Sequence, residues 1–380
     1  MHVERTTGRA ATGVAVSLVT LLAMLLSVLT AAPAHAYVTA PQPMWVWTVA
    51  GSGVSGFSGD GGPAYQAALN LPASVVPTPD GGFLVSDQEN HRIRKVDAAG
   101  VITTVAGTGQ AGYSGDGGAA TDAEIDQPRG LSLTADGGYL FADSGNNVIR
   151  QVSAGGVIST VAGTGTAGYA GDGGPATSAT LSTPTGVTAT ATGFLIADFA
   201  NNAVRKVDDT GTITTVAGGN GSGFTGDGGA ATAARLAHPF ATAVTPDGFV
   251  IADSSNNRIR QVSADGTITT VAGTGAGGSS YATVTGPATS AVVNNPVGVT
   301  ALPAGGFAIA EYGGHVVVRV SADGIVAPIV GSGGPGWFGD YGPATDASLN
   351  SPSAVAPLPD GGYLVADTHN NRIRWVDAAP

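Results

Sequence analysis

The chain has 380 residues, of which 60 are glycine and none is cysteine. Its 27 acidic residues outnumber the 15 lysines and arginines, so the formal net charge at pH 7 is −12. This charge argues against binding to nucleic acid and to anionic lipid, because both are themselves negative. The lack of cysteine excludes disulfides and a lipid-modified cysteine at the N-terminus, so stability must come from the core.

The first 36 residues have the pattern of a secretory signal peptide. Arg5 and Arg9 supply positive charge, residues 14–29 are almost wholly apolar, and alanines at positions 34 and 36 match the small residues that signal peptidase accepts. An uncleaved membrane anchor is the alternative, but the apolar run is shorter than the roughly 20 residues that a span needs. We therefore predict cleavage of residues 1–36, no later contact with the membrane, and a secreted protein, either free outside the cell or associated with the cell wall.

A repeated glycine-rich segment divides the rest of the chain into units of similar length. Its first copy is Ser58-Gly59-Asp60-Gly61-Gly62-Pro63-Ala64, and a degenerate copy, Thr285-Gly286-Pro287-Ala288, stands in the fifth unit. The aspartate of the segment occurs as Asp60, Asp116, Asp172, Asp227 and Asp340. Six units of about 56 residues account for residues 37–380, and we expect them to form one domain, since such repeats pack against one another.

Within the first unit, four short segments show the apolar alternation of β-strands. They cover residues 74–78, 83–86, 93–96 and 102–106, and residues rich in Gly, Pro, Asp and Asn separate them. Four short antiparallel strands, repeated six times, are typical of a propeller. We therefore predict an all-β fold, a six-bladed β-propeller of four-stranded blades.

The two ends of the chain indicate how the ring closes. The last unit contains three strand patterns, at residues 354–357, 363–365 and 373–376, and then the chain stops. The missing fourth pattern is found at the front, where residues 45–51 match residues 101–107. We expect the N-terminal strand to complete the last blade, because closure removes two exposed sheet edges.

Three segments give the chain its resemblance to a known family. They are residues 140–150 (LFADSGNNVIR), 251–260 (IADSSNNRIR) and 365–374 (VADTHNNRIR), and strands such as Pro184-Thr185-Gly186-Val187 precede them. In these segments and their spacing the chain resembles the NHL-repeat proteins. The resemblance implies a propeller that binds a ligand in most members and is an enzyme in a few. The fifth unit departs from the pattern, with Glu311-Tyr312-Gly313-Gly314-His315 in place of Asp-x-x-Asn-Asn.

Residues that recur in nearly every unit are expected to be structural, because every blade needs them. The aspartates of the glycine-rich segments could be a ring of metal ligands, but each loop offers one carboxylate, whereas calcium takes six to eight oxygens. We expect them to accept hydrogen bonds within their own loops. A second repeated set pairs an aspartate with an arginine seven residues later, and we predict an ion pair for each, either between strands or between blades. These pairs are Asp87 and Arg94, Asp143 and Arg150, Asp198 and Arg205, Asp253 and Arg260, and Asp367 and Arg374.

Function is expected where the units differ. Two sets of positions vary: the residues on either side of the proline that begins the innermost strand, and the turns between the second and third strands. Both sets should lie on one face of the ring, around the mouth of the central channel. The predicted ligand-binding residues in these sets are Arg129, Gln127, His238, Phe240, Asn295, Tyr312 and Phe199.

These residues indicate a binding function. Aromatic rings, amides and a few charges suit a protein segment, a polysaccharide or a small polar ligand, so we predict an extracellular binding or scaffold propeller, monomeric and without a cofactor. The alternative is a hydrolase or lyase that holds Ca or Zn in the central channel. Such a site needs three or more converging His, Asp or Glu ligands, and the mouth supplies one histidine. No catalytic motif supports the enzyme, and an adhesive wall protein is a third possibility.

Overall fold

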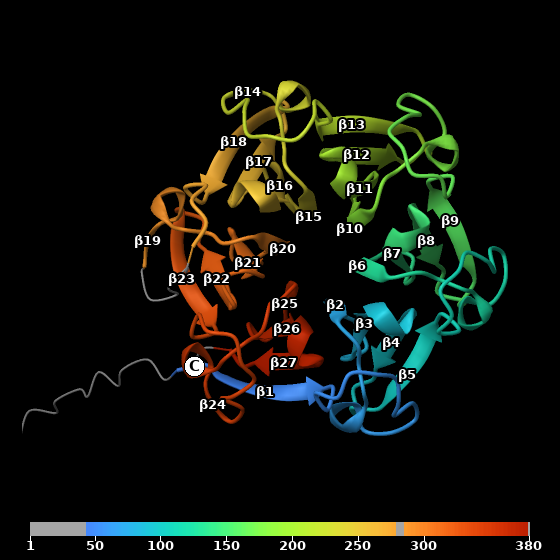
Figure 1. The fold of residues 1–380 in the computed structure, drawn as a ribbon, viewed down its shortest axis with the longest axis vertical. Helices are drawn as coiled ribbons and strands as arrows, with labels where there is room; N and C mark the ends of the chain where they lie inside the picture. The colour runs from blue at the N-terminus through green and yellow to red at the C-terminus, as the bar shows by residue number, and fades with distance from the viewer. Residues whose placement is uncertain (1–42, 279–284, 379–380) are drawn as a thin grey trace, which may run out of the picture. The chain divides into compact units, whose positions relative to one another are not determined.

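Six antiparallel sheets follow one another around a ring and form the six blades of a β-propeller (Figure 1). The computed structural model describes residues 43–278 and 285–378, so the predicted signal peptide, residues 1–36, lies outside the described residues. None of the short helices in the described ranges has the length and hydropathy of a membrane span. The alternation of apolar residues produces this architecture, because each strand places one set of side chains against a neighbouring blade.

Each blade has four main strands, numbered from the centre of the ring outward. In the first three blades they are β2 (Pro72–Pro77), β3 (Phe83–Asp87), β4 (Arg92–Val96) and β5 (Ile102–Ala106); β6 (Pro128–Leu133), β7 (Tyr139–Asp143), β8 (Val148–Val152) and β9 (Ile158–Ala162); and β10 (Pro184–Thr190), β11 (Gly193–Asp198), β12 (Ala203–Asp208) and β13 (Ile213–Gly218). Blades four and five consist of β15 (Pro239–Thr245), β16 (Gly248–Asp253), β17 (Arg258–Ser263) and β18 (Thr267–Ala272); and β20 (Pro296–Ala301), β21 (Phe307–Glu311), β22 (Val316–Val320) and β23 (Ile325–Val330).

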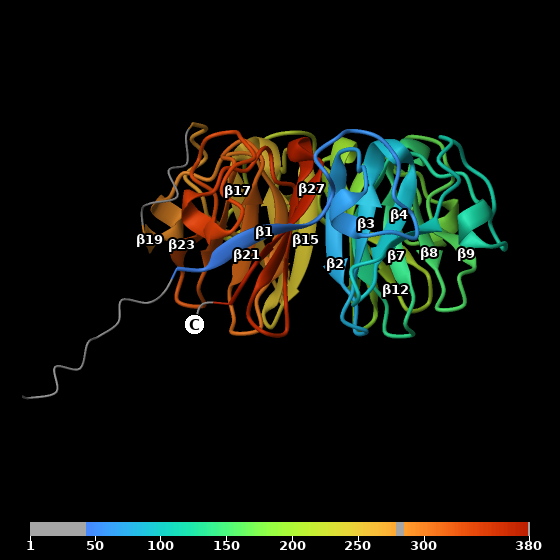
Figure 2. The same ribbon diagram turned by 90° about the horizontal axis from the view of Figure 1, so that it is seen from below.

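The sixth blade closes the ring as predicted. Its strands are β25 (Ala354–Pro357), β26 (Tyr363–Asp367), β27 (Arg372–Val376) and, from the other end of the chain, β1 (Trp45–Ala50). β1 pairs with β27 in antiparallel register, with Val46 opposite Val376 and Trp47 opposite Trp375. Figure 2 shows β1 along the outside of this blade.

The blades are slightly larger than predicted. Three sheets carry a fifth, two-residue strand on the outside: β14 (Gly229–Ala230), β19 (Gly286–Pro287) and β24 (Gly342–Pro343). The other three have an isolated bridge in the same place, such as Pro63 opposite Val101. Each of these segments belongs to the glycine-rich repeat, so the repeat covers the outer edge of its blade. This protects the edge from pairing with another chain.

Short 3₁₀ turns connect the strands at two recurrent places. One set follows the glycine-rich segment: η1 (Ala64–Gln66), η3 (Ala120–Asp122), η5 (Ala176–Ser178), η7 (Ala231–Ala233), η9 (Ala288–Ser290) and η10 (Ala344–Asp346). The other joins the second and third strands: η2 (Gln88–Asn90), η4 (Ser144–Asn146), η6 (Phe199–Asn201), η8 (Ser254–Asn256) and η11 (Thr368–Asn370). The fifth blade keeps its four strands but has a plain turn at residues 312–315 in this second place.

The hydrophobic core lies between blades. Each cluster of buried residues joins two neighbours, as where Leu84 and Ile93 of the first blade pack with Phe141 of the second. The innermost strands approach most closely at their first residues: a Cβ atom on Gly186 would lie 2.7 Å from the carbonyl oxygen of Phe240. Only glycine permits this approach, which explains the Pro-x-Gly pattern of the second, third and fifth blades, where Gly130, Gly186 and Gly298 stand. The other three blades have Ser74, Ala241 and Ala354 at this place.

Candidate functional site at the channel mouth

Each innermost strand begins with a residue in the left-handed region, and the preceding blade holds that residue in place. The φ angles of Leu71, Gln127, Thr183, His238, Asn295 and Ser351 lie between 47° and 53°. The backbone N–H of each donates a hydrogen bond to a side chain of the blade before it. We call these six hydrogen bonds the clasps. In each pair that follows, the side chain of the first residue accepts from the backbone N–H of the second, with 2.8 to 3.2 Å between donor and acceptor atoms. The pairs are Asn371 and Leu71, His91 and Gln127, Asn147 and Thr183, Asn202 and His238, Asn257 and Asn295, and His315 and Ser351.

The turns between the second and third strands lie against the residues just before these. In the first blade the N–H of Glu89 donates to the carbonyl of Asn70 at 3.1 Å. In the fifth, that of Gly313 donates to the carbonyl of Asn294 at 3.2 Å, and that of Tyr312 also donates to the carbonyl of Asn295 at 3.1 Å. Equivalent bonds form in the other four blades, from Gly145, Ala200, Ser255 and His369. The two variable sets of positions are therefore adjacent and surround one mouth of the channel.

Four of the predicted residues form one cluster across blades two to four. The rings of Phe199 and His238 stack with centroids 4.5 Å apart, and Phe199 meets Phe240 edge to face at 5.9 Å. The guanidinium carbon of Arg129 lies 5.7 Å from the centroid of the Phe240 ring. All four side chains are partly buried. They form an apolar wall with a positive group at its edge.

The other predicted residues form two separate pairs. Tyr312 donates to or accepts from His369 across blades five and six, with 2.8 Å between the Tyr312 hydroxyl and Nε2. Gln127 donates to Glu89 at 3.2 Å between blades one and two. Asn295 contributes its backbone to a clasp and to the Tyr312 turn. The partners Glu89 and His369 lie in the variable turns between the second and third strands and are not among the residues predicted to bind a ligand.

Arg129 dominates the electrostatics of the mouth. Burial lowers the pKa of its guanidinium from the usual value, and the charges of Glu89 and Tyr312 oppose that shift. The same arginine opposes the rise that burial causes in the pKa of Tyr312. Arg129 of the second blade therefore interacts electrostatically with groups of the first and fifth blades. It stays charged at neutral pH, because an arginine in a protein does not lose its proton.

Behind the mouth lies the central channel, a cavity of about 330 Å³. The six innermost strands line it with Val, Ala, Leu, Pro, Gly, Ser, Thr and one Phe, without a charged or imidazole side chain. Among the described residues, no group of three or more His, Asp or Glu side chains is placed to hold a metal ion. The residues of the channel therefore do not fit the bound Ca or Zn that the enzyme alternative needs.

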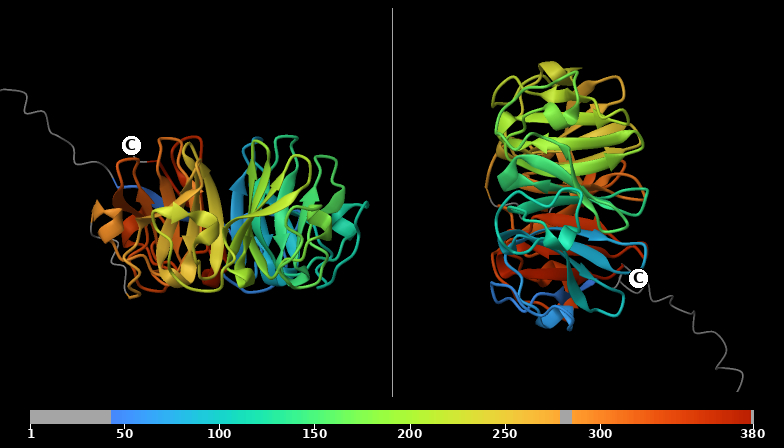
Figure 3. Two further views of the ribbon diagram at one scale, coloured as in Figure 1. Left: turned by 90° about the horizontal axis from the view of Figure 1, so that it is seen from above. Right: turned by 90° about the vertical axis from the view of Figure 1, so that its right-hand side faces the viewer.

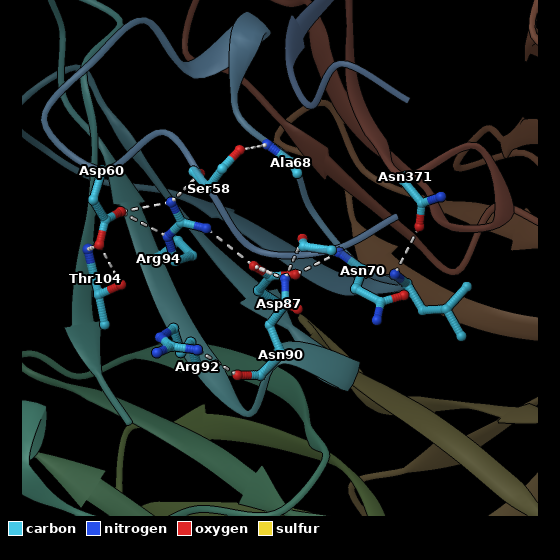
Figure 4. A network of polar contacts seen from close by, with 12 residues as sticks. Ser58, Asp60, Ala68, Asn70, Asp87, Asn90, Arg92, Arg94, Thr104 and Asn371 are labelled. Carbon is cyan, nitrogen blue, oxygen red and sulfur yellow. Dashed lines mark hydrogen bonds and ion pairs between the residues drawn. The ribbon is translucent and has the colours of Figure 1, made fainter. Parts of the chain in front are cut away.

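The repeated aspartates and arginines form a polar network in which each arginine and one of its two aspartates are fully buried (Figure 4). In the first blade the fully buried Arg94 contacts two carboxylates: that of the fully buried Asp87 at 3.1 Å and that of Asp60 in the glycine-rich loop. Asp87 also accepts the N–H of Asn70, which fixes the chain immediately before the mouth. The same arrangement is found in blades two, three, four and six. Burial raises the pKa of Asp143 to about 7 and of Asp198, Asp253 and Asp367 to about 6, and it also raises that of Asp87.

We expected the aspartates of the glycine-rich segments to accept hydrogen bonds within their own loops, but their carboxylates bind other strands of the blade instead. Asp60 binds Arg94 through one oxygen and the hydroxyl of Thr104 through the other, at 2.7 Å. It therefore joins the loop to the third and fourth strands of its blade. Asp116, Asp172, Asp227 and Asp340 make the corresponding contact with their own arginines.

The fifth blade replaces this network. Val318 occupies the register position of the buried arginine, opposite Ile309, and Glu311 stands in place of the buried aspartate. Glu311 is 2% exposed and accepts the N–H of Asn294 at 2.9 Å, so it still positions the chain before the mouth. The blade that supplies Tyr312 has thus kept the anchoring bond of the network, with a valine at the position of the buried arginine.

The clasp of His315 makes one link of the ring sensitive to acid. Its Nδ1 accepts the N–H of Ser351, which only a neutral imidazole can do. Burial and the nearby His369 lower the pKa of His315. The stability that this neutral ring contributes is therefore present above the unfolded pKa near 6.5 and is lost as pH falls below it.

We expect His315→Asn to lose less thermal stability than the wild type between pH 7.5 and pH 5, because Asn forms the clasp in four blades without titrating. Asn257→His, the reciprocal variant, should lose more; equal pH profiles in melting experiments would contradict this role.

Comparison with known proteins places the fold but not a family. No family model matches the chain. Human Teneurin-1 is 31% identical over 231 residues, which cover 55% of this chain and 8% of that protein. The chain spans less than a tenth of the length of the curated relatives it matches. Two solved structures share the fold: an auxiliary nutrient binding protein from Bacteroides thetaiotaomicron (TM-score 0.63, 16% identity, 89% of this chain and 78% of that one) and a protein described as a putative gluconolactonase (TM-score 0.54, 12% identity, 89% and 93%).

Proposed function

We propose that this protein is a binding propeller that holds its ligand at the mouth formed by the first residues of the innermost strands. The predicted signal peptide would place it outside the cell, where its partner is a protein segment, a polysaccharide or a small polar molecule. We propose that it acts as a monomer without nucleic acid. The NHL-like repeats and the nutrient binding protein of the same fold agree with such a role.

One observation carries the proposal. At the six equivalent positions after the proline of the innermost strand, four residues are small or medium-sized and buried: Ala73, Thr185, Val297 and Ser353. The other two are Arg129 and Phe240, whose side chains are only partly buried and meet over the opening. Packing needs small residues there, as the other four blades show. The two large side chains at these places are not needed to close the ring, so we propose that they contact a ligand at the mouth.

The experiment is a binding screen of the purified protein against arrays of peptides and polysaccharides. Replacing Arg129 and Phe240 together by Ala is expected to weaken the detected binding about tenfold or more, since aromatic and arginine contacts dominate most binding sites. The matched control replaces Arg319 and Phe338, which are exposed elsewhere, by Ala. Unchanged binding in the mouth variant, or a loss confined to the control, would show that the ligand binds away from the mouth.

A further inference from the structure

Arg129 is partly buried and, among the described residues, differs from the five fully buried arginines in having no ion pair. Each of the five network arginines contacts two carboxylates, as Arg94 contacts Asp60 and Asp87. Within the described ranges no ion pair joins Arg129 to a carboxylate, and its buried Nε has no hydrogen-bond acceptor. The Nε atoms of Arg150 and Arg374 are also without an acceptor, but both guanidinium groups are ion-paired. A partly buried guanidinium with no ion pair and with a buried Nε that lacks an acceptor is unfavourable, so an anion that binds there gains free energy.

The position of Arg129 directs that anion to the channel. Arg129 begins in blade two and Phe240 in blade four, yet the guanidinium and the ring are 5.7 Å apart. The arginine side chain therefore reaches past the third blade and over the opening. Phe240 is also part of the channel wall. A group bound to Arg129 thus sits directly above the cavity of about 330 Å³.

The cavity itself favours an apolar occupant. Most of its hydroxyl groups are used between blades: Ser132 accepts the N–H of Ala189 at 3.0 Å, Thr188 donates to the carbonyl of Thr242 at 2.7 Å, and Ser353 donates to that of Ala73 at 2.8 Å. The hydroxyl of Thr300 also lines the cavity. The remaining lining is formed by apolar side chains and backbone. A volume of this size lies at the lower end of the range of small-molecule sites.

We propose that the ligand is a small carboxylic acid with an apolar body. The carboxylate binds the Arg129 guanidinium, which matches it with two parallel hydrogen bonds. The apolar body passes the Phe240 ring and enters the channel. This inference rests on the proposed function and names the ligand class for the same mouth.

The charge near Arg129 can be changed by a substitution at Glu89. Its carboxylate is close enough to influence Arg129 without forming an ion pair, and it accepts hydrogen bonds from Gln88 and Gln127 at 3.1 and 3.2 Å. Glu89→Gln keeps an oxygen acceptor for these bonds and removes the negative charge. The variant should bind a carboxylate more tightly, because one repulsive charge is gone.

The test is calorimetric titration with 3-phenylpropionate and with 3-phenylpropionamide, which has the same body and no charge. We expect the acid to bind at least about tenfold more tightly than the amide. Arg129→Gln should abolish that preference and leave the weak binding of the amide unchanged, while Glu89→Gln should strengthen binding of the acid only. Equal binding of acid and amide, an unaffected acid in Arg129→Gln, or no binding of the acid at millimolar concentration would overturn the inference.

A further pair of probes identifies the source of the carboxylate. A tetrapeptide that ends in phenylalanine is titrated with a free and with an amidated C-terminus. The proposal expects both peptides to bind more weakly than 3-phenylpropionate, because the channel accepts a small body. If the free peptide bound more tightly, the carboxylate would come from a peptide end and the small-molecule proposal would be wrong. Array binding that depends on Arg129 and Phe240 would support the proposed function in either case.

Discussion

Arg260→Leu is expected to lower the free energy of unfolding by about 3–5 kcal/mol, because it leaves a buried charge without its partner. Arg260 is fully buried and lies 3.4 Å from the carboxylate of Asp253, which is fully buried too. In the variant Asp253 would keep the N–H of Ala237 and the amide of Asn256, but no cation. The loss is measured by denaturant unfolding at pH 7.5.

The control is Arg258→Leu, two residues earlier on β17. Arg258 stacks 3.7 Å from the centroid of Phe224 and donates only to carbonyl groups, those of Asn256 and Thr274. Its replacement should cost about 1 kcal/mol, the usual contribution of a partly exposed cation over a ring. Similar losses in the two variants would show that the buried network contributes nothing special.

The fifth blade suggests how the loss in Arg260→Leu can be recovered. There, Val318 fills the arginine position, so a blade folds with an apolar residue at this place. Adding Asp253→Asn to Arg260→Leu removes the uncompensated charge and should restore part of the stability. A double variant less stable than Arg260→Leu would mean that the hydrogen bonds of Asp253, and not its charge, are decisive.

The fold could be predicted from the sequence because every feature that determines it is repeated. The strand pattern, the closing strand and the aspartate–arginine pairs recur at fixed spacing, so each copy supports the others. The contact of Asp60 with Arg94 could not be predicted from the sequence. The two residues are 34 positions apart, and both recur with the same period, so their spacing alone does not show that they are in contact. The clasp of His91 was missed for a related reason: it joins a side chain of one blade to the backbone of the next.

The candidate site could be predicted only as a set of positions. Non-repetition selected Phe199, His238, Phe240 and Arg129, and the structure brings them into one cluster. Their ring geometry depends on side-chain rotamers that no spacing reveals. That Arg129 is unpaired also depends on every acidic group around it, and only coordinates show that the nearby Glu89 forms no ion pair with it.

Val46→Asp is expected to destabilise the propeller by about 4 kcal/mol or more, since it places a carboxylate in the joint that closes the ring. Val46 is fully buried with Ile329, Leu349 and Val376, between the fifth and sixth blades. Figure 3 shows the blue N-terminal segment beside the red C-terminal strands. Val46 also lies on β1, the N-terminal strand that pairs with the C-terminal strand β27. Displacing β1 would therefore expose a sheet edge as well as apolar core residues. Thermal unfolding and size-exclusion chromatography should therefore show a lower melting temperature and self-association.

Trp45→Asp provides the matched control for Val46→Asp. Trp45 is the preceding residue of β1 and is 44% exposed, so its side chain points away from the core that Val46 enters. Its backbone still pairs with Pro343 after the substitution. We expect a loss of about 1 kcal/mol and a monomer, the usual effect of a surface change. If both variants unfolded equally, β1 would stabilise the blade through its backbone pairing. The buried side chain of Val46, which corresponds to Ile102 in the first blade, would then not be what holds the ring closed.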